Sequence, residues 1–160
     1  MDLIYALVDT CVLSDIVRQY NPKLPNNNLI EGTYLKKDML RVVNRIITDE
    51  DEMSGYIITS TFAFVELINK FDSIFQDSVK IERIMAIMSQ PPSWLIVEEI
   101  NESTALNYCD VPNSIEGQSI SSDDAIHVAT AMQRGDDLFF LTTDHCLSKL
   151  NIPRITFVST

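Results

Sequence analysis

Short runs of continuously apolar residues alternate with helical patterns along nearly the whole chain. The apolar runs predict β-strands at residues 3–8, 56–60, 94–99, 138–142 and 155–159. The patterns between them predict helices near residues 10–20, 34–48, 61–72, 76–90, 101–108 and 122–134. Strands that are apolar on both faces and separated by helices indicate a parallel sheet covered on both sides. We therefore predict an α/β fold.

The chain has 160 residues, which favours a single domain over residues 1–160. We expect loops at residues 20–28, 49–52 and 112–122, where proline, asparagine, glycine, serine or acidic residues gather. No apolar stretch is long enough for a membrane span, and the N-terminus lacks the basic region of a signal peptide. Three scattered cysteines without a CxxC pair favour a cytoplasmic protein with free thiols.

The net charge of −11 argues against a passive nucleic-acid binder, whose affinity comes from lysine and arginine. It does not argue against an enzyme that holds metal ions in a cluster of carboxylates, because the cations then come from solution. Only four glycines occur, and neither GxGxxG nor a P-loop is present. The acidic residues are therefore the first place to look for chemistry.

The helix predicted at 122–134 opens with two adjacent aspartates. A polar stripe along this helix is predicted to face solvent: Asp123, His127, Thr130 and Arg134. Asp124 lies about 100° away, at the edge of the apolar side. It is either a capping-box partner of Ser121 or a functional carboxylate. His127 has three interpretations: a solvent-facing residue, a partner of Asp123, or a phosphate contact.

Three further acids have a possible functional role beside a structural one. Glu66 is the one charged residue among residues 62–68, which are otherwise apolar and lie at the start of a predicted helix. Because a buried charge without a partner is costly, Glu66 needs a cation, a hydrogen-bond network or an edge position that reaches solvent. Asp9 and Asp144 follow predicted strands and precede helical segments, where either an N-cap or a ligand is found. Because ligands bind at the carboxyl ends of parallel strands, Asp9, Glu66, Asp124 and Asp144 can meet at one edge. Oxygen-only ligands suit Mg²⁺ or Mn²⁺.

These motifs resemble a PIN domain, and most closely the VapC-type toxins of bacterial toxin–antitoxin pairs. The matching segments are VDTCVL, STFAFVELINK, DDAIHVATAM and LFFLTTDHCL, and the resemblance extends over residues 3–158. It implies a three-layer α/β/α fold with a five-stranded parallel sheet of order 3-2-1-4-5. It also implies metal-binding and catalytic roles for Asp9, Glu66, Asp124 and Asp144.

The resemblance further implies a Mg²⁺- or Mn²⁺-dependent endoribonuclease that cleaves structured RNA such as tRNA. Members of this family are held inactive by a small antitoxin and usually form homodimers, for which residues 81–88 are either a surface or part of the core. The expected products carry 5′-phosphate and 3′-hydroxyl ends. Asp9 and Asp124 are expected to bind the primary ion, Glu66 to orient water or hold that ion, and Asp144 to support a second ion or act through water.

Substrate contacts are expected from two groups of residues. The first is the hydroxyls at the strand ends, which are expected to contact the phosphate or to orient the acids and whose alternative role is to cap helices: Thr10, Thr142 and Thr143. The second is the basic face of the helix near 34–48, with Lys37, Arg41 and Arg45. This face is either a phosphate contact or an ordinary solvated surface.

Two classes of rival function remain open from the sequence. The first is a PIN-like domain that binds RNA or a protein partner without cleavage. The second is another phosphoryl-transfer protein. A haloacid-dehalogenase-like phosphatase needs a second aspartate where this chain has Cys11, and a response-regulator receiver needs an aspartate where this chain has Ser60 and Thr61.

Overall fold

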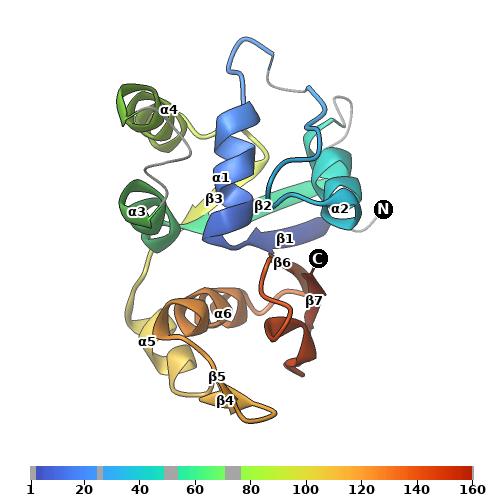
Figure 1. Ribbon diagram of the computed structural model, residues 1–160, viewed down its shortest axis with the longest axis vertical. Coiled ribbons are helices and arrows are strands. Elements are labelled where there is room, and N and C mark those ends of the chain that lie inside the picture. Colours follow the sequence, from blue (N-terminus) through green and yellow to red (C-terminus); the bar gives the residue numbers. More distant parts are fainter. Residues whose placement is uncertain (1–2, 25–26, 49–53, 71–76, 160) are drawn as a thin grey trace.

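A five-stranded parallel sheet forms the centre of the molecule (Figure 1). The computed structural model describes residues 3–24, 27–48, 54–70 and 77–159. In sheet order the strands are β3 (Leu95–Glu98), β2 (Gly55–Ser60), β1 (Ile4–Val8), β6 (Leu138–Thr142) and β7 (Ile155–Ser159). Every neighbouring pair is parallel. Numbered along the chain, this is the predicted order 3-2-1-4-5, so both the strands and their order are confirmed.

Helices cover both faces of the sheet, as the apolar strands require (Figure 1). One face carries α1 (Thr10–Gln19), α2 (Lys37–Ile47), α3 (Thr61–Lys70) and α4 (Asp77–Ser89). The other face carries α6 (Ser122–Arg134), with α5 (Glu102–Tyr108) packed against it. Two hydrophobic cores result, one on each side of the sheet. The predicted three-layer architecture is therefore confirmed.

The segment predicted as a loop at 112–122 contains a small antiparallel hairpin instead. Its strands are β4 (Ser114–Ile115) and β5 (Gln118–Ser119), and its turn places Glu116 and Gly117 at positive φ. Lys149, in the 3-10 helix η1 (Leu147–Lys149), forms an ion pair with Glu116 at 2.8 Å. The hairpin thus joins the segment before α6 to the segment after β6. The predicted loop at 20–28 has no helix or strand where it is described, and the turn at 49–52 lies outside the described residues.

Both α3 and α4 carry apolar side chains that are exposed as well as apolar side chains that are buried. A helix that is apolar on nearly all sides, as residues 62–68 are, is expected to be buried, but Val65 and Ile68 of α3 are exposed. In residues 81–88 of α4, Ile84 and Ile87 are buried. Exposed positions of the same segment are Ile81, Met85 and Met88. In the described part of the chain, no helix combines the length and apolar character that a membrane crossing needs.

A buried carboxylate on α1 fixes the chain that leads into α2. The Asp15 side chain is fully buried and accepts backbone hydrogen bonds from Tyr34 at 2.7 Å and Leu35 at 2.6 Å. Arg18 completes the site at 2.9 Å from the other carboxylate oxygen. A Cβ at Gly32 would lie 2.5 Å from the same carboxylate, so glycine leaves the room that Asp15 occupies.

Candidate active site

The four acids singled out in the sequence line one cavity. Asp9 follows β1, Glu66 lies in α3, Asp124 lies in the first turn of α6, and Asp144 follows β6. The cavity has a volume of about 260 Å³. Its remaining lining residues are Thr10, Cys11, Ser121, Asp123, His127 and Thr143. Four separate segments thus bring carboxylates to the carboxyl edge of the sheet, where α/β proteins bind ligands.

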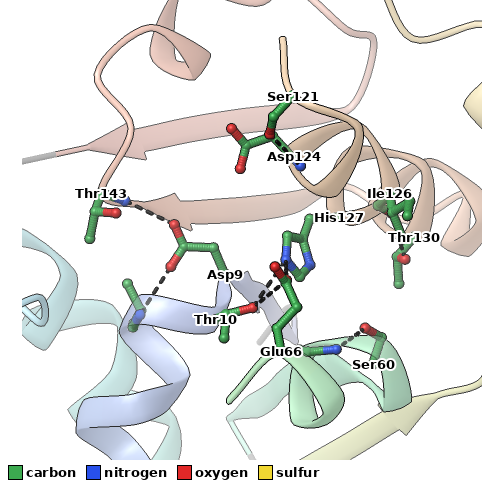
Figure 2. A network of polar contacts seen from close by, with 12 residues as sticks. Asp9, Thr10, Ser60, Glu66, Ser121, Asp124, Ile126, His127, Thr130 and Thr143 are labelled. Atoms are coloured by element: carbon green, nitrogen blue, oxygen red, sulfur yellow. Dashed lines mark hydrogen bonds and ion pairs between the residues drawn. The ribbon is translucent and has the colours of Figure 1, made fainter. Parts of the chain in front are cut away.

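Asp9 is both an N-cap and a cavity residue. One carboxylate oxygen accepts a hydrogen bond from the Val12 N–H at 3.0 Å, and the other accepts one from the Thr143 N–H at 3.0 Å (Figure 2). Burial raises the pKa of Asp9 above the ordinary value of 3.8, against the lowering effect of these two bonds. The two interpretations of Asp9 are therefore compatible, because each oxygen retains lone pairs after accepting one bond.

Glu66 is held in a buried polar cluster. Its Oε1 accepts a hydrogen bond from the Thr10 hydroxyl at 2.7 Å and lies 2.6 Å from Nε2 of His127 (Figure 2). Glu66 is only 7% exposed. Of the three environments that the sequence left open for Glu66, the structure has the hydrogen-bond network, at the edge of the cavity.

His127 does not lie on a solvent face, which corrects the predicted polar stripe of α6. Its side chain is 4% exposed, and Thr130 on the same stripe is fully buried with its hydroxyl donating to the Ile126 carbonyl at 2.8 Å. Arg134 is half-buried against Glu98 at 2.7 Å. Polar partners of His127 and Arg134 lie on α1, α3 and β3, and that of Thr130 is a carbonyl of α6 itself, which is why helical periodicity alone misassigned the stripe.

Asp124 and Asp144 come from different segments, the first turn of α6 and the segment after β6. Burial raises the pKa of Asp124, and the negative charge of Asp144 raises it further. The Asp124 N–H donates to the Ser121 hydroxyl at 3.1 Å, so the predicted cap at Ser121 is present. An oxygen of Asp144 accepts from the Cys146 N–H at 2.8 Å. Like Asp9, these acids combine a capping arrangement with a place at the cavity.

Cys11 also lines the cavity, which the sequence motifs did not indicate. Burial, and next the charge of Asp9, raise the pKa of the Cys11 thiol to about 11, so it is a neutral thiol at physiological pH. Its position beside Asp9 at the start of α1 was visible in the sequence. A thiol in that position has no distinguishing pattern, however.

The expected substrate-contact residues divide into two groups. Thr10 and Thr143 line the cavity, whereas Thr142 is fully buried and its hydroxyl accepts from the Asp144 N–H at 3.0 Å. The basic residues of α2, Lys37, Arg41 and Arg45, are exposed but do not line the cavity. The Arg45 carbonyl accepts from Ser54, just before β2, which places that end of α2 at the opposite edge of the sheet. Among the described residues, the cavity lining contains no lysine or arginine.

The donor set fits a hard divalent cation by its chemistry. Carboxylate oxygens dominate the lining, and burial raises the pKa of Asp9 and of Asp124 although hydrogen bonds and the nearby His127 act in the opposite direction. Within the described ranges, no three His, Cys, Asp or Glu side chains are grouped closely enough to hold one ion. Glu66 is engaged with Thr10 and His127. Because hydrogen bonds hold Asp9 and Glu66, three carboxylates can share one ion only if Asp124 or Asp144 changes its side-chain conformation.

The raised pKa of Asp124 predicts how pH affects stability without added metal. A carboxyl group whose pKa is higher in the folded protein favours folding below its unfolded pKa and loses that contribution as pH rises through the folded pKa. We expect Asp124→Asn to unfold at a higher temperature than the parent at about pH 7, and this gain to shrink toward about pH 4. Thermal unfolding in EDTA across this range measures the difference. A gain that does not change with pH would contradict the prediction.

No protein-family model and no curated protein matches the sequence. Solved structures do match the fold. VapBC2 from Rickettsia felis, bound to a promoter DNA fragment, aligns over 98% of each chain with a TM-score of 0.61 at 12% identity. VapC20 from Mycobacterium tuberculosis, a sarcin-ricin loop cleaving toxin, aligns over 94% of this chain and 98% of its own with a TM-score of 0.56 at 12% identity.

A toxin–antitoxin complex from Klebsiella pneumoniae aligns over 94% of this chain and 95% of its own, with a TM-score of 0.51 at 16% identity. At identities this low, the structural similarity shows the fold, and the chemistry depends on the residues of the site. Nearly complete coverage in both directions agrees with the element order and strand order described above. The chain therefore has the PIN-like fold of the VapC-type toxins.

Proposed function

We propose that this chain is a Mg²⁺- or Mn²⁺-dependent endoribonuclease and the toxin of a type II toxin–antitoxin pair. One observation carries the proposal: Asp9, Glu66, Asp124 and Asp144 line a single cavity at the carboxyl edge of the sheet. The fold shared with VapC20, a sarcin-ricin loop cleaving toxin, supports RNA as the substrate. The target of the proposed cleavage is structured RNA such as tRNA.

The chain's own residues can be given roles in phosphodiester hydrolysis. A bound divalent cation supplies Lewis-acid polarisation and lowers the pKa of a coordinated water. Asp9 and Asp124 would hold it directly, and Asp9 is preset for this because two backbone N–H groups fix its carboxylate. Glu66 would orient the attacking water or hold the same ion. Asp144 would support a second ion or act through water.

The hydroxyls beside the acids have more limited roles. The Thr10 hydroxyl donates to Glu66 and so orients that acid rather than a phosphate. Thr143 orients Asp9 through its backbone N–H and presents its side chain at the cavity. Since no lysine or arginine of the described residues lines this cavity, cations from solution would carry much of the neutralisation of the RNA phosphate there.

Partners and location belong to the same proposal. The VapBC2 and Klebsiella pneumoniae structures are toxin–antitoxin assemblies, which supports a small antitoxin as the partner of this chain. The exposed Ile81, Met85 and Met88 offer an apolar surface for a homodimer. A cytoplasmic location is supported by the free thiols of Cys11, Cys109 and Cys146.

Asp9→Asn tests the catalytic proposal. We expect cleavage of a structured RNA in Mn²⁺ to fall more than about 100-fold, beyond the effect typical of groups that only orient metal ligands. A gel assay with purified parent and variant, each repeated in EDTA, measures the rates. Circular dichroism verifies that the variant is folded.

Two outcomes would count against this proposal. Equal cleavage by parent and Asp9→Asn would identify a contaminating nuclease. Absence of cleavage by the parent in both metals, together with retained RNA or antitoxin binding, would favour the alternative of a PIN-like domain that binds without cleaving.

A further inference from the structure

We propose that His127 is a positioning residue of this site, which holds Glu66 in place together with the Thr10 hydroxyl and thereby sets the affinity for the divalent cation. This inference rests on the proposed function and adds a residue that the acid motifs do not contain. His127 lines the cavity beside Asp124 and comes from the same helix, α6.

The hydrogen-bond chemistry fixes what each partner does. Glu66 is ionised if it takes part in binding a cation, and an ionised carboxylate only accepts hydrogen bonds, so in that state Nε2 of His127 donates to Glu66 Oε1 across the contact of 2.6 Å. The Thr10 hydroxyl donates to the same oxygen at 2.7 Å. Both bonds therefore end on Oε1, and neither uses Oε2. The two donors together fix the position of Oε1.

The surroundings make this arrangement rigid. Glu66 and His127 are both nearly fully buried, so bulk water does not compete effectively for the contact. The imidazole ring also packs against the ring of Phe62, with 5.5 Å between the ring centroids. Figure 2 shows the three polar partners arriving from α1, α3 and α6. Rotating Glu66 away would require breaking two hydrogen bonds in a packed environment.

The bond between Glu66 and His127 also links two acids that lie far apart in the chain. His127 follows Asp124 by three residues on α6, about one helical turn, whereas Glu66 lies on α3. The contact ties the helix that carries Asp124 to the helix that carries Glu66. Loss of the contact would loosen the relative placement of both carboxylates. Groups that orient metal ligands in this way typically change metal affinity by about 10–100-fold.

The test compares two replacements of His127 that separate packing from hydrogen bonding. His127→Leu keeps an apolar body but removes the donor, and His127→Gln keeps a donor near the position of Nε2. We expect Mn²⁺ binding, measured by calorimetry, to weaken at least about tenfold in His127→Leu and to stay within about threefold of the parent in His127→Gln. Thr10→Val, which removes the hydroxyl at nearly constant volume, should weaken binding in the same direction, and Thr10→Ser should not.

The outcomes distinguish this inference from the proposed function. If the parent binds Mn²⁺ and cleaves RNA, and His127→Leu and Thr10→Val bind Mn²⁺ as tightly as the parent, the positioning role is overturned and the nuclease proposal stands. If the parent takes up no Mn²⁺, the proposed function fails and this inference fails with it. Should His127→Leu not fold, the Thr10 pair and His127→Gln carry the test. A His127→Gln variant that folds but binds about tenfold more weakly would overturn the role of the donor.

Discussion

Asp124→Asn is expected to abolish RNA cleavage and Mn²⁺ uptake, while Asp123→Asn retains both. The two aspartates are adjacent, and both lie in the first turn of α6. They therefore share the helix-terminus environment and contribute equally to the net charge. Burial and the charge of Asp144 raise the pKa of Asp124. Repulsion from Asp144 places Asp124 in the group of carboxylates that a divalent cation would neutralise.

The magnitude should separate the two variants clearly. We expect more than about 100-fold loss of cleavage for Asp124→Asn and less than about threefold for Asp123→Asn, since loss of a ligand exceeds the effect of groups that only orient ligands. Calorimetric titration with Mn²⁺ and a cleavage assay on the same preparations measure both quantities. An inactive Asp123→Asn together with an active Asp124→Asn would show that Asp123, and not Asp124, is the ligand. If both variants were as active as the parent, neither aspartate of α6 would be a metal ligand.

Asp15→Ala is expected to cause the largest loss of stability among the substitutions considered, without touching the cavity. The backbone N–H groups of Tyr34 and Leu35 and the guanidinium of Arg18 would lose their shared acceptor. Leaving each of the two backbone N–H donors without an acceptor costs about 1–3 kcal/mol, and Arg18 adds less because its side chain is 38% exposed. For a chain of this size, that corresponds to a fall in Tm on the order of 10 °C.

Asp38→Ala provides a control that removes the same charge and the same side chain from an exposed position on a helix. Asp38 is exposed in the first turn of α2, where loss of its favourable interaction with the helix N-terminus costs about 0.3–1 kcal/mol. Urea unfolding of both variants gives the two free energies. Asp15→Asn, which keeps one acceptor oxygen, should fall between them. Equal stability of Asp15→Ala and Asp38→Ala would show that the 32–35 turn is held by other contacts.

The fold could be predicted because its determinants are local and repeated. Each strand of the sheet is a short apolar run, and each helix that follows has its own pattern, so type and approximate position followed from the sequence. The hairpin at 114–119 was missed because each of its strands has two residues, which is too short for an alternating pattern. Its Glu116–Gly117 turn lacks the Asn-Gly or Asp-Gly pair that most often marks a two-residue hairpin loop.

The candidate site could be predicted only where residues share a topological position. Asp9 and Asp144 follow strands, and parallel strands end at the same edge, so their meeting was foreseeable. His127 was assigned to solvent because helical periodicity describes one helix, and its partner Glu66 lies on another. The basic residues of α2 were proposed as RNA contacts from their spacing alone. Spacing does not tell which edge of the sheet a helix end reaches.

The short hairpin has a consequence for how the spacing between two carboxylates is controlled. β5 ends three residues before α6 begins, and Glu116 is tied to Lys149 on the segment that follows Asp144. The hairpin therefore acts as an external brace between the two loops that present Asp124 and Asp144. An insertion or deletion in it would widen or narrow the mouth between those acids without replacing either of them. The length of the hairpin would in this way change access to the cavity while the four acids themselves stay the same.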